Sequence, residues 1–446
     1  KGENKITLES TNEPMAINAL RLVPVNKIDS YEQYLTKQKS KPENYTSTGI
    51  QVKIQGEDSI VRSDPSLFAR YDRSSATTEP NSVSRTVVNY SGGDSWKSPG
   101  QWIEWEFEVP EDGWYTISIK GRQLYQRGYV ACRSVYIDGE IPIQPLQSVG
   151  FPYSSDWNLV TLQDANPYKL NLSKGKHRIR LEVTLGEIGS VINDLQDSIY
   201  RLNNIYRTIL VLTGSYPDQY RDYQIDKVYP DEVEAMMLES RRLYKEVDRF
   251  ISITGEKSDK IAPAETLAIQ LEQFYKRPDK ITKAFSNFKD NITSLGSSLL
   301  TMTESKLDVD YILVQSANDR IKPVKANFFK NAAHEISAFF SSFFVDSSSL
   351  GNVYEKDAEH LIEVWIVTGR DQSQILKNMI DDSFSPSTGI KVNVKNININ
   401  SLLTAVVAGN GPDVVISAYQ RLPVDYALRN AVVDLRRFDD CDEIIK

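Results

Sequence analysis

The stretch of sequence that decides the fold is Leu307-Asp308-Val309-Asp310-Tyr311-Ile312-Leu313-Val314-Gln315. Its β-branched residues and partly alternating apolar pattern predict a strand, although helical patterns lie on both sides of it. A single strand between helices cannot form a sheet alone. We therefore expect residues 307–314 to pair with strands from another part of the chain.

Residues 46–186 have the pattern of an all-β domain. Apolar and polar residues alternate at 102–109, 115–119 and 177–183, which places one face of each strand on a core and the other on solvent. Turn signals such as Asp138-Gly139 separate the alternating runs. The pattern predicts an antiparallel sandwich formed by residues 46–186 together with a closing strand at 305–316.

Residues 187–303 have a helical period. Apolar residues recur every three or four positions, and Pro230 and Gly255 stand at the start and after the end of one such run, where these residue types are expected. The pattern predicts a bundle of antiparallel helices inserted between the last two strands of the β domain. We interpret residues 317–359 as a further helix followed by a linker.

From residue 360 to residue 446, strand patterns alternate with helix patterns. Strands are expected at 361–367, 390–394 and 413–416, with helices at 371–384, 400–408 and 423–430. This alternation predicts βαβ units and a parallel sheet. Residues 1–45 are treated as an N-terminal extension, with short strands expected at 5–8 and 20–25 and a short helix at 30–39.

Charge and composition restrict the class of protein. The 446 residues include 52 Lys and Arg and 60 Asp and Glu, a formal net charge of −8. We find no strong local basic patch, so nucleic acid is not an expected partner. The 2 cysteines and 3 histidines are scattered, which argues against a metal site, and no cofactor is expected. No apolar run reaches the ~18 residues of a membrane span.

Catalytic motifs are also missing from the sequence. The Gly-x-Ser-x-Gly motif of an activated serine and the phosphate-binding P-loop are both absent. The acidic pairs Asp381-Asp382 and Asp439-Asp440 do not form a convincing carboxylate dyad, because adjacent residues on a helix point in different directions. We therefore predict no catalytic residue and that the chain is not an enzyme.

Five motifs after residue 360 carry a family resemblance. They are Glu363-Val364-Trp365-Ile366 with Thr368-Gly369-Arg370, Phe384 before Thr388-Gly389-Ile390-Lys391-Val392, Leu402-Leu403-Thr404-Ala405, Gly409-Asn410-Gly411-Pro412-Asp413-Val414-Val415, and Ala431-Val432-Val433-Asp434-Leu435. In this order they resemble the start of an extracellular solute-binding protein (family 1-like) of sugar-type ABC importers. The resemblance implies the first α/β lobe of a type-1 periplasmic-binding-protein-like fold. The second lobe is missing from this chain, so we expect residues 1–446 alone to hold free sugars weakly.

The β region resembles galactose-binding-like sandwiches of the carbohydrate-binding-module type. The motifs that carry this resemblance are Glu111-Asp112-Gly113-Trp114-Tyr115-Thr116-Ile117, Val135-Tyr136-Ile137-Asp138-Gly139 and Leu172-Ser173-Lys174-Gly175-Lys176-His177. The whole chain resembles large surface lipoproteins that carry such a sandwich ahead of a solute-binding module. This implies an extracellular, lipid-anchored protein at the bacterial cell surface, with an oligosaccharide ligand and an ABC permease as partner.

Two groups of residues are candidate binding sites. Ligands of α/β sheets bind outside the carboxyl ends of the strands, and polar side chains with stacking aromatics suit sugars. At the predicted strand ends the candidates are Thr368, Arg370, Asp371, Asn398, Tyr419 and Gln420, with an ordinary loop or helix-cap role as the alternative. In the sandwich the possible glycan-stacking residues are Trp96, Tyr125, Tyr153 and Trp157, for which loop packing and domain docking are the preferred interpretation.

The preferred hypothesis is reversible carbohydrate capture for ABC-type import, without chemistry. Two rival functions remain open on the sequence alone. One is a glycan-binding or adhesion protein of the cell surface that takes no part in transport. The other is an accessory region of a carbohydrate-active enzyme.

Overall fold

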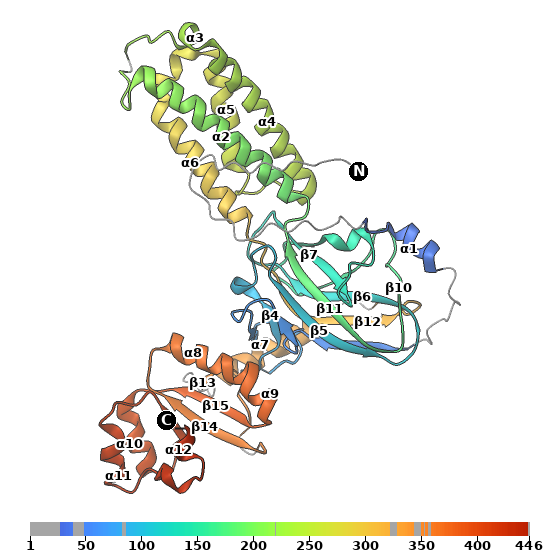
Figure 1. Ribbon diagram of the computed structural model, residues 1–446, viewed down its shortest axis with the longest axis vertical. Helices are drawn as coiled ribbons and strands as arrows, with labels where there is room; N and C mark the ends of the chain where they lie inside the picture. Colours follow the sequence, from blue (N-terminus) through green and yellow to red (C-terminus); the bar gives the residue numbers. More distant parts are fainter. Residues whose placement is uncertain are drawn as a thin grey trace.

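The computed structural model describes residues 27–38, 49–82, 86–218, 220–321, 328–342, 349–351, 353–355 and 358–444. Figure 1 shows a β-sandwich in the middle, a helical bundle at one end of it and a small α/β unit at the other. The strands expected at 5–8 and 20–25 lie outside the described residues. The helix expected at 30–39 is α1 (Tyr31–Gln38).

The sandwich consists of two antiparallel sheets. The seven-stranded sheet has the order β10-β6-β12-β4-β3, with β1 also paired to β12 and β9 to β6, and the five-stranded sheet has the order β2-β5-β11-β7-β8. The strands are β1 (Gln51–Gln55), β2 (Val61–Arg62), β3 (Ala69–Arg70), β4 (Tyr90–Gly92), β5 (Trp102–Val109), β6 (Gly113–Arg122), β7 (Val130–Ile137), β8 (Val149–Pro152), β9 (Asn158–Thr161), β10 (Leu170–Leu172), β11 (Gly175–Thr184) and β12 (Asp308–Ser316). One hydrophobic core lies between the two sheets.

Strand β12 confirms the prediction that residues 307–314 return to the sandwich. It pairs antiparallel with β6 along its whole length, and on its other side with β1 and β4. All nine of its residues are buried. Because the strand has neighbours on both sides, its backbone N–H and C=O groups find partners in the sheet, which allows it to be buried along its whole length.

A β-bulge in β12 explains why its sequence alternates only in part. The pairing with β6 shifts between Val309 and Tyr311, so Asp310 is an extra residue in the strand. Val309 points into the core before the bulge, and Ile312 and Val314 point into it after the bulge. One inserted residue therefore changes which positions face the core.

The outer face of the seven-stranded sheet carries buried charges. Lys120 and Asp310 are both fully buried and form an ion pair at 2.6 Å. Arg122 binds Asp72 at 2.8 Å and Asp308 at 3.2 Å. Burial opposes ionisation of Asp72, but the Ser74 hydroxyl and the Arg122 charge outweigh it and lower the pKa of Asp72. Because each charge has a partner, this polar layer is stable inside the domain.

The predicted helical insertion corresponds to α2 (Ile188–Thr213), α3 (Ile225–Val228), α4 (Pro230–Thr254), α5 (Ala262–Lys276) and α6 (Phe285–Met302). α4 starts at Pro230, and Gly255 follows its end with a φ of 80° that glycine adopts without strain. The helices share a second hydrophobic core, separate from that of the sandwich.

The junction between bundle and sandwich is tightly bonded. Tyr129 extends from the sandwich into the core of the bundle and donates its hydroxyl proton to the carbonyl of Met302 at 2.7 Å. Ser305, in the connection to β12, accepts hydrogen bonds from the Cys132 amide at 3.0 Å and from Arg133 at 3.2 Å. These contacts fix the base of the bundle to the sheet that contains β7.

The α/β unit has a four-stranded sheet in the order β13-β15-β14-β16. The strands β15, β14 and β16 are parallel, as the sequence predicts, and β13 joins antiparallel at the edge. The bounds are β13 (Ser349–Leu350), β14 (Leu361–Ile366), β15 (Lys391–Asn396), β16 (Val414–Ile416), α8 (Arg370–Met379), α9 (Ser385–Thr388), α10 (Ile399–Val407), α11 (Leu422–Ala427) and α12 (Cys441–Ile444). The helix expected within 317–359 is α7 (Phe328–Ser342), which contacts the sandwich through a hydrogen bond between His334 and the Arg73 carbonyl at 2.9 Å. None of the helices in the described residues combines the length and hydropathy needed to cross a bilayer.

The first prediction concerns the core position of β12. Ile312→Ala should reduce the free energy of unfolding of the sandwich by about 2–4 kcal/mol, because it leaves a cavity in a fully buried strand. Urea denaturation followed by tryptophan fluorescence measures this effect, since five of the six tryptophans lie between residues 96 and 157. The matched control is Leu300→Ala on α6, which is 73% exposed and should change stability by less than about 0.5 kcal/mol. Equal effects of the two variants would contradict the buried position of Ile312.

The second prediction concerns Glu57, in the loop after β1. Burial, with smaller contributions from the Asp58 and Asp310 charges, raises the pKa of Glu57 from its ordinary value of 4.5 to about 8. Between these pH values the folded chain holds a proton that the unfolded chain has lost, so stability falls as the pH rises through this window. Glu57→Gln removes that loss. On going from pH 5 to pH 8, the free energy of unfolding of the variant should therefore rise by roughly 1–3 kcal/mol relative to that of the parent.

Urea denaturation at pH 5 and pH 8 measures the gain of Glu57→Gln. Glu140→Gln, which replaces an exposed carboxylate of the same sandwich, is the control and should follow the pH profile of the parent. A stability difference between Glu57→Gln and the parent that is the same at both pH values would show that Glu57 does not carry the effect.

Candidate functional site

The three parallel strands of the α/β unit end at one edge of the sheet. Ile366 at the end of β14 pairs with Asn396 at the end of β15 and with Ile416 at the end of β16. The loops that follow these strands therefore lie side by side. These loops and the first turn of α8 hold all six predicted residues of this site, from Thr368 to Gln420.

Part of this edge is fixed by a hydrogen-bond network. The Asn396 amide donates to the Thr368 carbonyl at 2.8 Å and to the Ser373 hydroxyl at 2.7 Å, which ties the loop after β14 to the end of β15. Asn398 accepts a hydrogen bond from the Asn400 amide at 3.0 Å and caps α10. Its side-chain oxygen is thus already used in the helix-cap role that the sequence left as the alternative.

The other four residues present their side chains to solvent. Arg370 and Asp371 form the exposed first turn of α8, whose N-cap is Gly369 rather than Asp371. Tyr419 is 65% exposed and lies with exposed Gln420 in the loop after β16. The edge therefore combines a cation, a carboxylate, an amide and a phenol ring on an open surface. Among the described residues, no group of three or more His, Cys, Asp or Glu side chains is placed to hold a metal.

The structure corrects the stacking role proposed for Trp96 and Trp157. Trp96 is 0% exposed and packs beneath the Arg133 guanidinium at 4.2 Å. Trp157 is 2% exposed, lies at 4.3 Å from the Arg122 guanidinium and donates its ring N–H to Asp72 at 3.0 Å. Both rings are covered by protein, so neither offers a face to a sugar and the loop-packing alternative describes them.

The two tyrosine candidates differ from each other. The Tyr125 hydroxyl donates to Asp308 at 2.8 Å, and burial together with the Asp308 charge raises the pKa of Tyr125. This ring is half-buried and belongs to the polar layer of the sheet. Tyr153 is 40% exposed, so of the four sandwich candidates it is the one whose ring is open to solvent.

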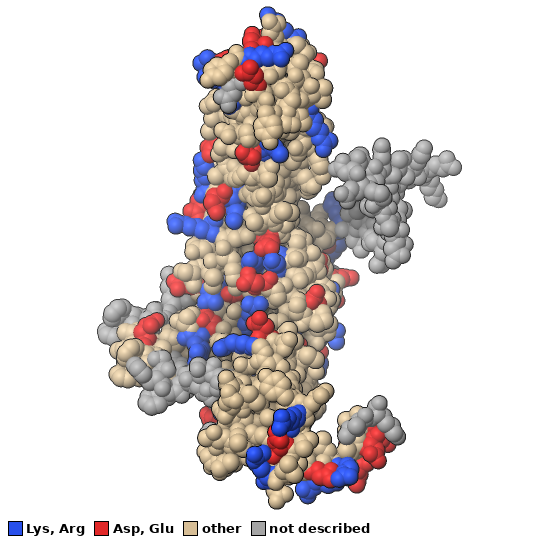
Figure 2. Space-filling view, turned by 90° about the vertical axis from the view of Figure 1, so that its left-hand side faces the viewer, with Lys and Arg blue, Asp and Glu red and all other residues tan. Residues whose placement is uncertain are grey.

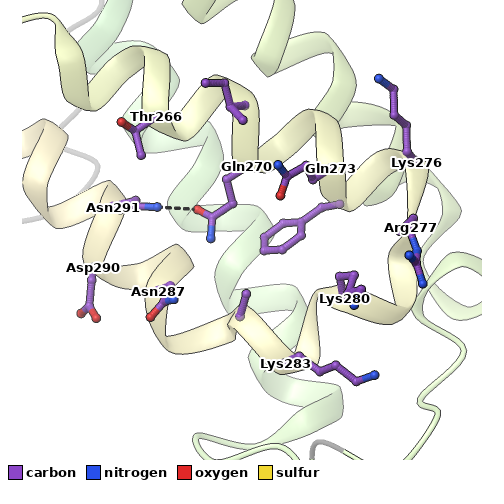
Figure 3. A pocket seen from close by; sticks show the side chains of 13 residues that line it. Thr266, Gln270, Gln273, Lys276, Arg277, Lys280, Lys283, Asn287, Asp290 and Asn291 are labelled. Atoms are coloured by element: carbon purple, nitrogen blue, oxygen red, sulfur yellow. Dashed lines mark hydrogen bonds between the residues drawn. The ribbon is translucent and has the colours of Figure 1, made fainter.

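A cleft between α5 and α6 was not anticipated from the sequence. Its volume is about 780 Å³, and its lining includes Lys276, Arg277, Lys280 and Lys283. Figure 3 shows Lys276, Arg277 and Lys280 on one side of the cleft and Asn287, Asp290 and Asn291 on the other. The signal for it was four basic residues within 276–283, but Asp279 interrupts this stretch and it contains no basic run longer than two.

The charges elsewhere do not form a comparable surface on the face that Figure 2 presents. Basic and acidic side chains are interspersed there over the whole length of the molecule. The sequence analysis did not anticipate that the helix-turn-helix geometry brings four cations to the lining of the α5–α6 cleft.

Comparison with known proteins yields one family match. Residues 190–305 match the family model described as the bacterial solute-binding protein, 4-helix bundle domain. These residues extend from α2 to the connection before β12, so the match covers the whole inserted bundle. A search of curated proteins finds no match.

Three of the similar solved structures are proteins that bind or act on carbohydrates. One is a cycloisomaltooligosaccharide glucanotransferase from Paenibacillus sp., at 19% identity and a TM-score of 0.22, covering 34% of this chain and 21% of that chain. A family 35 carbohydrate binding module from Clostridium thermocellum has 18% identity and a TM-score of 0.23, covering 30% of this chain and 88% of the module. The Podospora anserina GH26-CBM35 β-(1,4)-mannanase has 16% identity and a TM-score of 0.22, and the match covers 30% of this chain and 24% of the mannanase.

These likenesses are partial in two ways. The chain spans about a fifth of the length of the glucanotransferase that it matches, since 21% of that protein is covered. At TM-scores of 0.22 and 0.23 they do not establish a shared fold for the chain. The inserted bundle is the part of the molecule that is similar to a domain of bacterial solute-binding proteins.

Proposed function

We propose that this protein binds an oligosaccharide reversibly, without catalysis, as the solute-binding component of an ABC-type importer. The observation that carries the proposal is the match of residues 190–305 to a domain of bacterial solute-binding proteins. In the same chain, the α/β unit has a parallel sheet whose carboxyl edge is open and polar. Ligands of open α/β sheets bind outside this edge.

The chemistry of the edge fits a sugar. The exposed Tyr419 ring provides a flat apolar face for stacking on a pyranose ring. Sugar hydroxyls can both donate and accept hydrogen bonds. The edge offers them the donors of Arg370, the acceptors of Asp371 and the amide of Gln420, which donates and accepts. Because the surface is open rather than enclosed, water competes for each hydrogen bond, and a single bond contributes only about 0.5–1.5 kcal/mol net. We therefore expect millimolar rather than micromolar affinity at this edge.

The importer role extends the proposal to partners and location. A solute-binding component presents its ligand to a permease in the membrane, so the partner is an ABC permease and the site of action is the outer surface of a bacterial cell. A lipid anchor would hold the protein there. These three statements come from the family resemblance of residues 361–446 and from the match over the bundle.

The third prediction tests sugar binding at the sheet edge. Saturation-transfer difference NMR with the 446-residue chain and a panel of neutral oligosaccharides detects weak binding directly. At least one oligosaccharide should show transfer from the protein, and Tyr419→Ala should reduce that signal by roughly fivefold or more, because one stacking contact contributes about 1 kcal/mol.

The matched control is Tyr216→Ala, which removes a tyrosine that is 97% exposed in the bundle and should leave the transfer unchanged. Tyr153→Ala tests the one sandwich candidate that remains exposed. Binding that survives Tyr419→Ala but is lost in Tyr153→Ala would move the sugar site to the sandwich. Hydrolysis of any oligosaccharide in the panel would contradict the non-catalytic part of the proposal.

A further inference from the structure

The α5–α6 cleft has the dimensions of a small-molecule site. Its volume of about 780 Å³ lies within the ~300–1,000 Å³ of typical ligand pockets. It is also pre-formed: the Asn291 amide donates to Gln270 across the two helices at 2.8 Å, and Phe274 packs edge-on against Phe288 at 5.6 Å beneath it. A pre-formed cleft loses little conformational entropy when a ligand binds.

The electrostatics of the cleft favour an anion. Four cations and one carboxylate, Asp290, line it, although the whole chain has a net charge of −8. Lys276 is paired with Glu272 at 2.6 Å, and Arg277 lies 3.5 Å from Asp279. Lys280 and Lys283 form no ion pair with any residue in the described part of the chain. Their charges are therefore available to a ligand.

The position of Lys283 strengthens this argument. It lies immediately before α6, an 18-residue helix with no side-chain cap and no acidic residue in its first turn. The N-terminal end of a helix carries partial positive charge, which disfavours a cation at that place and favours an anion. Lys283 and the helix end thus present positive charge at the same point, with no carboxylate in the first turn of α6 to balance it.

The uncharged lining restricts the class of anion. Thr266, Gln270, Gln273, Asn287 and Asn291 contribute one hydroxyl and four amides, which both donate and accept hydrogen bonds. Figure 3 shows Gln270 and Gln273 between the basic side of the cleft and the side formed by Asn287 and Asn291. A bare inorganic anion would leave most of these groups unused, whereas the hydroxyls of a sugar would pair with them.

Nucleic acid fits this cleft less well. Binding of single strands relies on aromatic rings that stack on bases. The aromatic residue in the lining, Phe274, is 2% exposed and forms the floor, so its ring face is not available for stacking. The exposed apolar contact is Ile269, at 44%, which suits the C–H face of a sugar ring.

We propose that the cleft between α5 and α6 binds an acidic oligosaccharide, with Lys280, Lys283 and Arg277 on the acidic group and the amides of α5 and α6 on the hydroxyls. This site is separate from the sheet edge: the bundle and the α/β unit lie at opposite ends of the molecule (Figure 1). It does not depend on the importer role. Carboxylated and sulfated sugars share the required chemistry, and the experiment distinguishes them.

Isothermal titration calorimetry with the full 446-residue chain tests the site. The probes are trigalacturonate and 3′-sulfolactose, each compared with its uncharged counterpart, the trimethyl ester of trigalacturonate and lactose. At least one acidic probe should bind, at least tenfold more tightly than its uncharged counterpart, and its affinity should fall as salt is raised from 20 to 200 mM. Lys280→Gln/Lys283→Gln should weaken that binding by roughly tenfold or more.

Two control variants separate the cleft from general charge effects and from the sheet edge. Lys289→Gln removes an exposed charge from α6 outside the cleft lining and should change the affinity by less than about twofold. Tyr419→Ala should not change the affinity for the acidic probes. A failure of the cleft proposal is therefore distinguishable from a failure of the proposed sugar site at the sheet edge. A variant with the circular dichroism spectrum and melting temperature of the parent is folded. Of the three replaced lysines, Lys283 and Lys289 are exposed and Lys280 is half-buried.

Four results would overturn the proposal. They are no binding of either acidic probe, equal binding of the acidic and uncharged probes, affinity unchanged in Lys280→Gln/Lys283→Gln, and inorganic sulfate or phosphate binding as tightly as the acidic sugar. The last result would show an anion site to which the amides contribute nothing. Asn287→Ala should weaken the binding of the acidic sugar and leave any binding of inorganic sulfate unchanged. This pair of results would confirm that the amides contribute to sugar binding.

Discussion

The pairing of β12 with β6 and β1 is the constraint on which the rest of the structure depends. β12 supplies Val309, Ile312 and Val314 to the core of the sandwich, and Leu307 just before it supplies a fourth residue. Yet this strand follows the whole helical bundle in the chain. The sandwich therefore closes only after the bundle has returned to its base. This closure requires glycine at two positions. A Cβ at Gly56 would lie 2.2 Å from the Val309 carbonyl oxygen, and a Cβ at Gly92 would lie 2.1 Å from the Leu307 carbonyl oxygen.

This constraint also sets the position of the bundle. α2 starts at Ile188, shortly after β11 ends at Thr184, and β12 starts at Asp308, shortly after α6 ends at Met302. Both connections are too short to allow free rotation, and Tyr129 is bonded into the base of the bundle. The cleft between α5 and α6 is therefore held at a fixed orientation from the sandwich. The α/β unit contacts the sandwich through the Arg62–Asp382 ion pair and the Val353–Thr86 hydrogen bond at 2.9 Å.

The sequence predicts much of the architecture and less of the sites. The return of residues 307–314 to the sandwich follows from β-branched residues between helices, and the parallel sheet follows from the alternation after residue 360. Loop packing is the preferred interpretation of Trp96 and Trp157 from the sequence. Their partners Arg133, Arg122 and Asp72 were not predictable, because these residues are remote in sequence and form a site for each ring only in the folded domain. The basic cleft was missed for a related reason, since its cations converge only through the turn between α5 and α6.

The proposed site of neutral sugar capture is the carboxyl edge of β14, β15 and β16, on a scaffold that closes through β12. Hydrogen–deuterium exchange of the 446-residue chain, with and without a saturating neutral oligosaccharide, tests this most directly. Added protection should be confined to peptides that cover residues 366–371, 396–400 and 416–421, where the three strand ends meet. Protection that appears instead in the sandwich loops around residues 149–158, with none at the sheet edge, would contradict it.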